Sequence, residues 1–166
     1  QAVEMFYFSQ WYEEASEARR AAARRLVAEG RLEFAVGGWV MPDEATVDYT
    51  DLIETMTLGH QFILDAFGVR PRYGFQVDPF GASSTFAAFS AKMGFDAHVL
   101  ARINYFDKGW MQRERQLEFL WRPSEDAAAG AGQADETSSH SSSAPPRGST
   151  PPLEIFTHVM DQYQYS

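Results

Sequence analysis

Stretches with the two-residue periodicity of a strand are separated by stretches of helical periodicity between residues 3 and 100. Apolar residues alternate with other residues over 31–36 and 72–77, and short apolar runs occupy 3–8 and 95–100. Strands that alternate with helices form βαβ units, whose strands lie parallel in one sheet. The sequence therefore predicts an α/β fold with a parallel sheet.

Residues that favour helix ends indicate where the helices lie. Ser9 can cap a helix that ends near Gly30. A second helix is predicted from about Asp48 to Gly68, and a third, shorter helix over roughly 83–93. These helices fall between the predicted strands, as a βαβ arrangement requires.

Residues 124–152 interrupt this order, because they contain no Val, Leu, Ile or aromatic residue. A segment rich in Ala, Gly, Ser and Pro has little apolar surface to bury against the entropy of ordering. We therefore expect a disordered surface insertion, whose low complexity also fits an intron read through. The α/β domain would then comprise 1–123 and resume over 153–166, with a strand near 153–160.

Charge and composition exclude several classes of function. The net charge of −9 argues against binding to a nucleic-acid backbone, which needs clustered Lys and Arg. The chain has no cysteine, which excludes disulfides and Cys-ligated zinc within it. No apolar stretch approaches the roughly 20 residues needed to span a bilayer. Neither end looks like a natural terminus, so an internal piece of a longer protein is expected.

Ligands of parallel α/β folds bind at the carboxyl ends of the strands. The candidates at those ends are Trp39, Asp78, Arg102, Tyr163 and Tyr165. Asp78 stands out, because it follows an apolar strand and precedes Pro79, which delays the next helix. A carboxylate fixed on a strand end suits a nucleophile or a metal ligand.

Each candidate also has a plain structural interpretation. Asp78 could cap a turn, and Arg102 could form an ordinary ion pair instead of holding Asp78 or substrate hydroxyls. Trp39 could stack on a sugar ring, although packing in the core is the commoner role of such a side chain. Tyr163 and Tyr165 share a face if extended, and could either donate a hydroxyl to a ligand or pack.

The histidines do not predict a complete metal site. His60, His98, His140 and His158 form neither a His-x-His nor a His-x₃-His pair. His158 lies near a predicted strand end and could donate a hydrogen bond behind a ligand, but we favour a structural role for it. Spacing alone therefore yields no zinc site within this chain.

Six stretches carry recognisable motifs: 30–34 (GRLEF), 37–45 (GGWVMPDEA), 78–81 (DPFG), 93–96 (MGFD), 115–122 (RQLEFLWR) and 156–160 (FTHVM). Together they cover essentially all of the chain except the Ser-rich segment. In this order they resemble glycoside hydrolase family 38, the class II α-mannosidases that include Golgi and lysosomal enzymes.

The resemblance implies a partial, barrel-like (β/α) catalytic domain of a retaining, zinc-assisted enzyme that cleaves α-mannosidic linkages in N-glycans. Asp78 matches the nucleophile, which is also a zinc ligand, and Phe80 matches an aromatic residue lining the sugar site. Arg102 matches a residue that positions nucleophile and substrate, and Tyr165 matches a tyrosine of the substrate pocket. The other zinc ligands and the acid/base are expected outside this chain, which would be inactive alone. The resemblance also implies the secretory pathway, either the Golgi or the lysosome or vacuole.

Two departures from the family pattern leave an alternative open. Ala82 stands where family members usually have His, and Asn104 stands where lysosomal-type members have Asp. These changes give some support to a non-catalytic, mannoside-binding pseudoenzyme, against which the retention of Asp78 argues. A polysaccharide deacetylase is disfavoured, because its Asp-Asp and His-x₃-His pairs are missing. A purely structural domain is disfavoured by the motif residues at strand ends.

Overall fold

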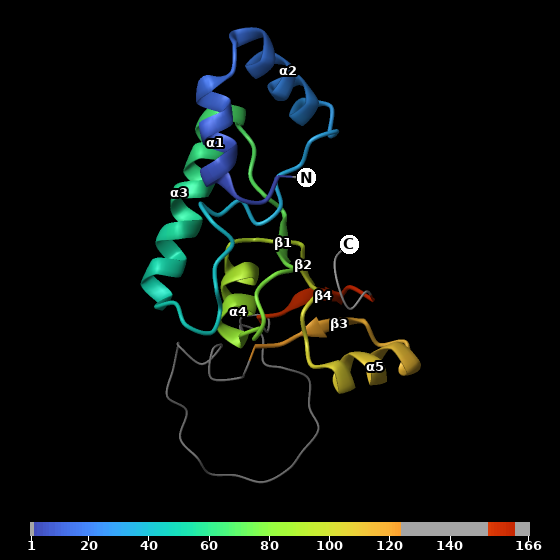
Figure 1. Cartoon of the computed structure of the whole chain (residues 1–166). Coiled ribbons are helices and arrows are strands. Elements are labelled where there is room, and N and C mark those ends of the chain that lie inside the picture. Colours follow the sequence, from blue (N-terminus) through green and yellow to red (C-terminus); the bar gives the residue numbers. More distant parts are fainter. Residues whose placement is uncertain (1, 124–152, 162–166) are drawn as a thin grey trace, which may run out of the picture.

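A computed structural model of the chain describes residues 2–123 and 153–161 and confirms an α/β fold (Figure 1). The predicted insertion over 124–152 and the candidates Tyr163 and Tyr165 lie outside these residues. The helices are α1 (Met5–Glu14), α2 (Glu17–Ala28), α3 (Tyr49–Phe67), α4 (Ser84–Lys92) and α5 (Tyr105–Glu114). The strands are β1 (Tyr73–Gln76), β2 (Ala97–Leu100), β3 (Glu118–Trp121) and β4 (Ile155–Val159).

The four strands form one mixed sheet in the order β1-β2-β4-β3. β1, β2 and β4 run parallel, whereas β3 pairs antiparallel with β4. The prediction of a parallel sheet is therefore wrong at β3, whose pairing with β4 is antiparallel. The strand order is linear within the described part, so these four strands do not close the expected barrel.

The apolar run over 3–8 is helical, and the strand predicted there is wrong. Its residues belong to α1, whose first N–H groups are satisfied by the chain rather than by a capping side chain: Met5 donates to the Gly38 carbonyl and Phe6 to the Trp39 carbonyl. A short apolar run does not distinguish a buried strand from a buried helix. Ser9 lies inside α1, and Ser16 instead precedes a separate helix, α2.

The predicted strand over 31–36 is reduced to a single parallel bridge between Ala2 and Phe34. The regular pattern stops at Val36, which has the left-handed φ of 59°. That conformation is rare for a β-branched residue, and hydrogen bonds to both the N–H and the carbonyl of Val36 stabilise it here. The Val36 N–H donates to the Tyr73 carbonyl at 2.7 Å, and its carbonyl lies 2.7 Å from His60 Nε2.

The remaining predicted elements are confirmed, because local signals define them well. The Asp48 side chain accepts the Thr50 N–H at the start of α3, and Gly68 ends this helix with a left-handed φ of 69°. Ser83 caps α4 by accepting the Phe86 N–H. Strands β1, β2 and β4 fall within the predicted ranges.

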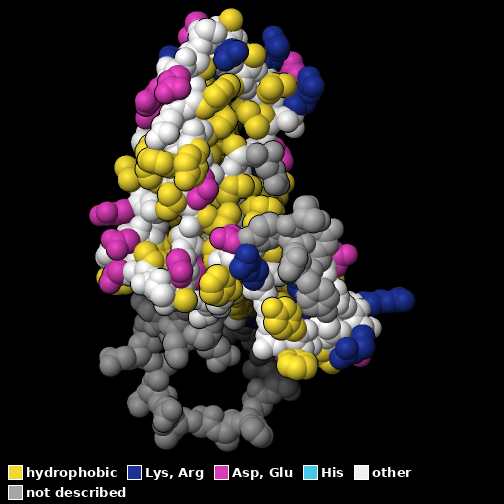
Figure 2. Space-filling view, in the orientation of Figure 1, with side chains coloured by type: hydrophobic (Ala, Val, Ile, Leu, Met, Phe, Trp, Pro, Cys, Tyr) yellow, Lys and Arg dark blue, Asp and Glu magenta, His cyan; other side chains and the backbone are white. Residues whose placement is uncertain are grey.

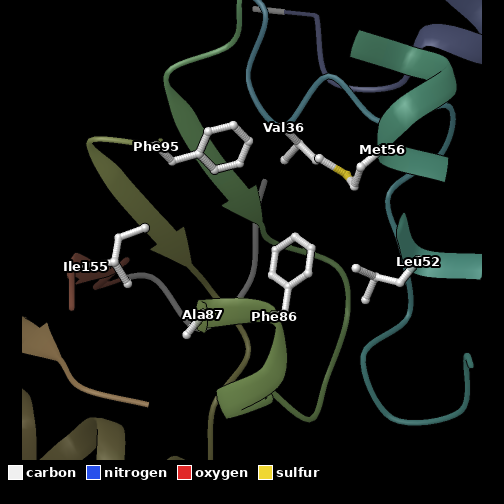
Figure 3. Packing of buried hydrophobic residues seen from close by; sticks show 7 residues of the cluster. All are labelled: Val36, Leu52, Met56, Phe86, Ala87, Phe95 and Ile155. Atoms are coloured by element: carbon white, nitrogen blue, oxygen red, sulfur yellow. The ribbon is translucent and has the colours of Figure 1, made fainter. Parts of the chain in front are cut away.

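Two hydrophobic clusters form the core, and one of them joins helices to the sheet. This cluster is built from α3, α4, β4, the segment between α2 and α3, and the segment before β2 (Figure 3). In it Phe86 of α4 is fully buried between the sheet and α3, where Leu52 and Met56 approach it. The second cluster joins α1 and α3 through Met5, Phe34 and Ile63.

Large hydrophobic side chains are also exposed on several helices, and Figure 2 shows hydrophobic side chains on this face over α1, α3 and α5. They include Tyr7, Trp11, Tyr49, Leu58, Tyr105 and Phe106. Despite this apolar surface, none of the helices in 2–123 combines the length and hydropathy needed to cross a membrane.

Candidate active site

Asp78 and Arg102 meet at the carboxyl ends of two neighbouring parallel strands. β1 and β2 are in register, with Gln76 opposite Leu100, so Asp78 and Arg102 each lie two residues beyond a paired strand end. Arg102 Nη2 lies 2.9 Å from Asp78 Oδ1. The expectation that both residues lie at the carboxyl ends of neighbouring strands is confirmed by this register and contact.

Phe80 completes the group. Its ring lies below the Arg102 guanidinium, with 5.5 Å between Cζ and the ring centroid, a cation–π distance. The Phe80 side chain is largely exposed at 73%. The side chains of Asp78 and Arg102 are also open to solvent. Three of the four site residues implied by the resemblance therefore lie together on an open edge, and Tyr165, the fourth, lies outside the described residues.

Trp39 is not part of this group. It packs against the second hydrophobic cluster, and its ring lies edge-on to Phe6 at 6.0 Å between centroids. Its backbone N–H donates to the Thr55 carbonyl on α3. The structural interpretation of Trp39 is the one that these contacts support.

A buried polar cluster lies behind the segment that carries Asp78. Gln76, only 1% exposed, donates from Nε2 to the Pro42 carbonyl at 2.9 Å and to Glu44 Oε1 at 3.0 Å. Glu44 Oε2 accepts the Ser83 N–H at 2.5 Å. Burial raises the pKa of the Glu44 carboxyl, and the hydrogen bonds from Ser83 and Gln76 oppose that rise. Sequence reasoning missed Glu44, although it lies in one of the matching stretches.

The segment that presents Glu44 is itself fixed. Asp43 Oδ1 accepts the N–H groups of Ala45 and Thr46 at 2.7 and 3.1 Å, which lowers the pKa of Asp43. Glu4 Oε1 accepts the Met41 N–H at 3.0 Å. The turn before α3 is therefore tied to the start of α1 at one end and closed by its own aspartate at the other.

Lys108 supports the strand end that leads to Arg102. It is 2% exposed, and its Nζ donates to the Ala101 carbonyl at 2.7 Å. Burial lowers the pKa of Lys108, and the nearby charge of Asp161 acts in the opposite direction. Asn104 caps α5 by accepting the Phe106 N–H at 2.9 Å. Asn and Asp cap helices about equally well, so the departure at this position keeps the cap.

His140 lies outside the described residues, and the other three histidines contact neighbouring parts of the protein. His98 is buried on β2 beside Phe86 and Trp121, and burial lowers its pKa to about 4. His158 Nδ1 lies 2.8 Å from Glu118 Oε1 on the adjacent strand. Over residues 2–123 and 153–161, no group of three or more His, Cys, Asp or Glu side chains is placed to hold a metal ion.

The site thus offers an exposed carboxylate just beyond the end of β1, a cation beside it and an aromatic ring beneath that cation. A carboxylate in this position can attack an electrophilic carbon or donate to a cation. The guanidinium can hold hydroxyl groups, and the ring presents a flat apolar surface that suits a sugar face.

Comparison with known proteins gives one consistent answer. A family model described as "Glycosyl hydrolases family 38 N-terminal domain" matches residues 1–166. The chain is 42% identical over 165 residues to the epididymis-specific alpha-mannosidase of Sus scrofa, covering 99% of this chain and 14% of that protein. It is 45% identical over 131 residues to the lysosomal alpha-mannosidase of Cavia porcellus, covering 78% of this chain and 13% of that protein.

A solved structure shares the fold. The crystal structure of an alpha-mannosidase from Enterococcus faecalis V583 matches with a TM-score of 0.56 at 14% sequence identity, over 87% of this chain and 13% of that chain. At that identity the likeness speaks for the fold alone. In each comparison the chain spans only a small part of the longer protein.

Proposed function

The chain belongs to glycoside hydrolase family 38, and from that premise we propose that it is a segment of the catalytic domain of an α-mannosidase. The relatives it matches are named α-mannosidases. Because the chain spans 14% of the first of them, the proposal concerns a longer protein that carries this sequence. The observation that carries the proposal is the pairing of Asp78 with Arg102 at the sheet edge where α/β enzymes bind their ligands.

In the proposed mechanism Asp78 is the nucleophile. Its carboxylate attacks the anomeric carbon of a terminal α-mannoside and forms a covalent mannosyl-enzyme, while the bond from that carbon to the leaving oxygen breaks. Water then cleaves the ester and releases mannose with retained configuration. An acid/base carboxyl must protonate the leaving oxygen and activate that water, and we place it outside this chain.

Arg102 and Phe80 would position the reacting groups. The 2.9 Å contact restrains the Asp78 carboxylate, and a nucleophile held in one orientation loses less entropy on the way to the transition state. The exposed Phe80 ring, held below the same guanidinium, supplies an apolar face for the sugar. Arg102 therefore links the carboxylate to the proposed sugar-binding surface.

Zinc is implied by the family resemblance, and the described residues do not fit it by themselves. They contain no group of three or more candidate ligands, and Asp78 is one carboxylate on an open edge. We therefore derive no step through the metal. We propose only that Asp78 contributes one ligand to a zinc ion whose other ligands lie elsewhere in the longer protein.

A covalent trap tests this function. The full-length protein would be incubated with a mannosyl fluoride whose ring fluorine slows the second step, and then digested and analysed by mass spectrometry. We expect the mass of the ring-fluorinated mannosyl group on the peptide that contains Asp78, with fluoride released from the anomeric carbon, and Asp78→Asn is expected to abolish this label. A full-length protein that binds mannosides but neither hydrolyses nor traps the reagent would be the pseudoenzyme alternative.

We further propose N-glycans as the substrate class and the secretory pathway as the location, since a lysosomal enzyme is among the relatives. The isolated 166-residue chain is proposed to be inactive, because it would lack the acid/base and most zinc ligands. Hydrolysis of an aryl α-mannoside by the purified chain, above that of its Asp78→Asn variant, would contradict this point.

A further inference from the structure

One carboxylate, that of Glu44, holds both ends of the loop that carries Asp78 and Phe80. This loop, residues 77–82, connects β1 to α4. The Gln76 side chain at its start donates to one oxygen of Glu44 at 3.0 Å. The Ser83 N–H at its end donates to the other oxygen at 2.5 Å. Because each oxygen binds a different end, Glu44 fixes the separation of the two ends.

The turn that carries Glu44 is rigid enough to act as an anchor. Asp43 closes it through two backbone N–H groups, and Pro42 accepts the second hydrogen of the Gln76 amide. Turn and loop also lie close together, since a Cβ added to Gly81 would lie 3.5 Å from the Ala45 Cβ. Movement of the Asp78 loop would therefore break contacts with a segment far from it in sequence.

Gln76 is a polar residue at a buried position, where packing alone would favour an apolar side chain. It is buried at the end of β1, and within the described part of the chain its Oε1 has no hydrogen-bond partner. An unpaired buried acceptor disfavours folding. Burial also disfavours the charged form of Glu44. Gln76 and Glu44, two polar side chains whose burial does not favour folding, thus contact each other at the start of the loop that carries Asp78.

We propose that Glu44 is a positioning residue for the reaction: by tying Gln76 to Ser83 it places the Asp78 carboxylate against Arg102. The inference rests on the proposed function, in which Asp78 attacks the sugar. Glu44 acts through the loop and need not touch the substrate. A displacement of the nucleophile by about 1 Å can lower the rate on the order of 100-fold. The rate should therefore be sensitive to any contact that fixes the ends of the loop.

The test uses the full-length protein and compares four variants. Glu44→Gln removes one of the two acceptors, and Gln76→Met removes the amide donor while keeping the side-chain length. The double variant measures their coupling, and Glu54→Gln, an exposed carboxylate on α3, controls for loss of one negative charge. The readouts are kcat, KM, the rate of labelling by the ring-fluorinated mannosyl fluoride and the thermal unfolding midpoint.

We expect Glu44→Gln and Gln76→Met to slow both kcat and labelling roughly 10- to 100-fold with little change in KM, because the lost contact acts on the nucleophile. The double variant should be about as slow as the slower of the two single variants, because both changes break the same contact between Glu44 and Gln76. Glu54→Gln should behave as the unaltered protein. If Glu44→Gln does not fold, the Gln76→Met result decides the question.

Labelling of Asp78 at the unaltered rate in a folded Glu44→Gln or Gln76→Met protein would overturn the role of Glu44 while leaving Asp78 as nucleophile. Absence of label from Asp78 in the unaltered protein would overturn the proposed function itself. The two failures are therefore distinguishable in one set of measurements.

Discussion

The backbone of Gly59 on α3 touches the backbone of Gly37: a Cβ added to Gly59 would lie 2.0 Å from the Gly37 carbonyl oxygen. The same Cβ would also lie 2.5 Å from the carbonyl carbon of Gly38. Neither atom can move away by a side-chain rotation, because both are backbone atoms. The contact allows Trp39 to donate its N–H to the Thr55 carbonyl at 2.8 Å. α3 thus packs directly against residues 37–39, the segment that precedes the Glu44 turn.

We expect Gly59→Ala to destabilise the protein by about 2 kcal/mol or more, despite the better helix propensity of Ala. The free energy of unfolding, measured with denaturant, checks this. Gly68→Ala is the matched control, because that glycine has a φ of 69° but nothing within 4 Å of an added Cβ. It should cost about 1 kcal/mol, the conformational part alone. Equal losses in the two variants would contradict the steric argument.

Arg102 contacts both Asp78 and Phe80. Substitutions should separate the contribution of its positive charge from that of its planar guanidinium. We expect Arg102→Met in the full-length protein to lower kcat/KM for an aryl α-mannoside roughly 100-fold, because the partner of the carboxylate is lost. Arg102→Lys keeps the charge but not the planar guanidinium, and should recover only part of the activity. Full activity in Arg102→Met would show that the ion pair is only a surface contact.

His98 should make stability depend on pH. Its folded pKa of about 4 lies below the ordinary value of 6.5, because burial disfavours the charged ring. The neutral form therefore contributes stability that is fully present above about pH 6.5 and is lost as the pH falls toward 4, by about 3 kcal/mol in all.

His98→Phe keeps a ring between Phe86 and Trp121 without a titrating group, and should weaken this acid dependence. Denaturant unfolding of both proteins at several values between pH 7 and pH 4 measures the difference. The difference also removes the effect of groups common to both proteins, such as Glu44. Parallel pH curves for the two proteins would exclude His98 as the cause.

Asp78→Asn should also weaken metal binding if its carboxylate is a zinc ligand. We expect the purified full-length variant to retain less than about a tenth of the zinc per molecule of the unaltered protein after mild dialysis against a chelator, since loss of a ligand or its support costs 10- to 100-fold in affinity. Elemental analysis provides the measurement, with Asp96→Asn, which loses a carboxylate paired with Arg72, as the control. Equal zinc content in all three proteins would remove Asp78 from the ligand set.

The sequence was informative where local chemistry decides the structure. Helix α3 was predicted from the helical spacing of its apolar residues and from Gly68 at its end, and β1 from the alternation over 72–77. The structure adds the caps Asp48 and Ser83, which fix where α3 and α4 begin. The rule about parallel strands placed Asp78 and Arg102 at the same end of the sheet, and their pairing was one of the alternatives that this placement left open.

The failures arose where distant segments decide. The run over 3–8 became helical because its first N–H groups pair with Gly38 and Trp39, which no local pattern reveals. The antiparallel β3 depends on a partner more than thirty residues away, Ile155–Val159. Glu44 carries no signal of its own, because its role exists only when Gln76 and Ser83 are brought to it by the fold.

The strand order β1-β2-β4-β3 also has a consequence for synthesis on the ribosome. β2 and β3 both pair with β4, and β4, beginning at Ile155, is the last of the four described strands to be made. Until it emerges, β3 lacks the strand it pairs with in the described sheet, and one edge of β2 is open to other chains. A chain that ends within residues 124–152 would thus have β1 and β2 as its only paired strands among those described. The edge of β2 that pairs with β4 in the sheet, which includes the buried His98, would be open to pairing with other chains.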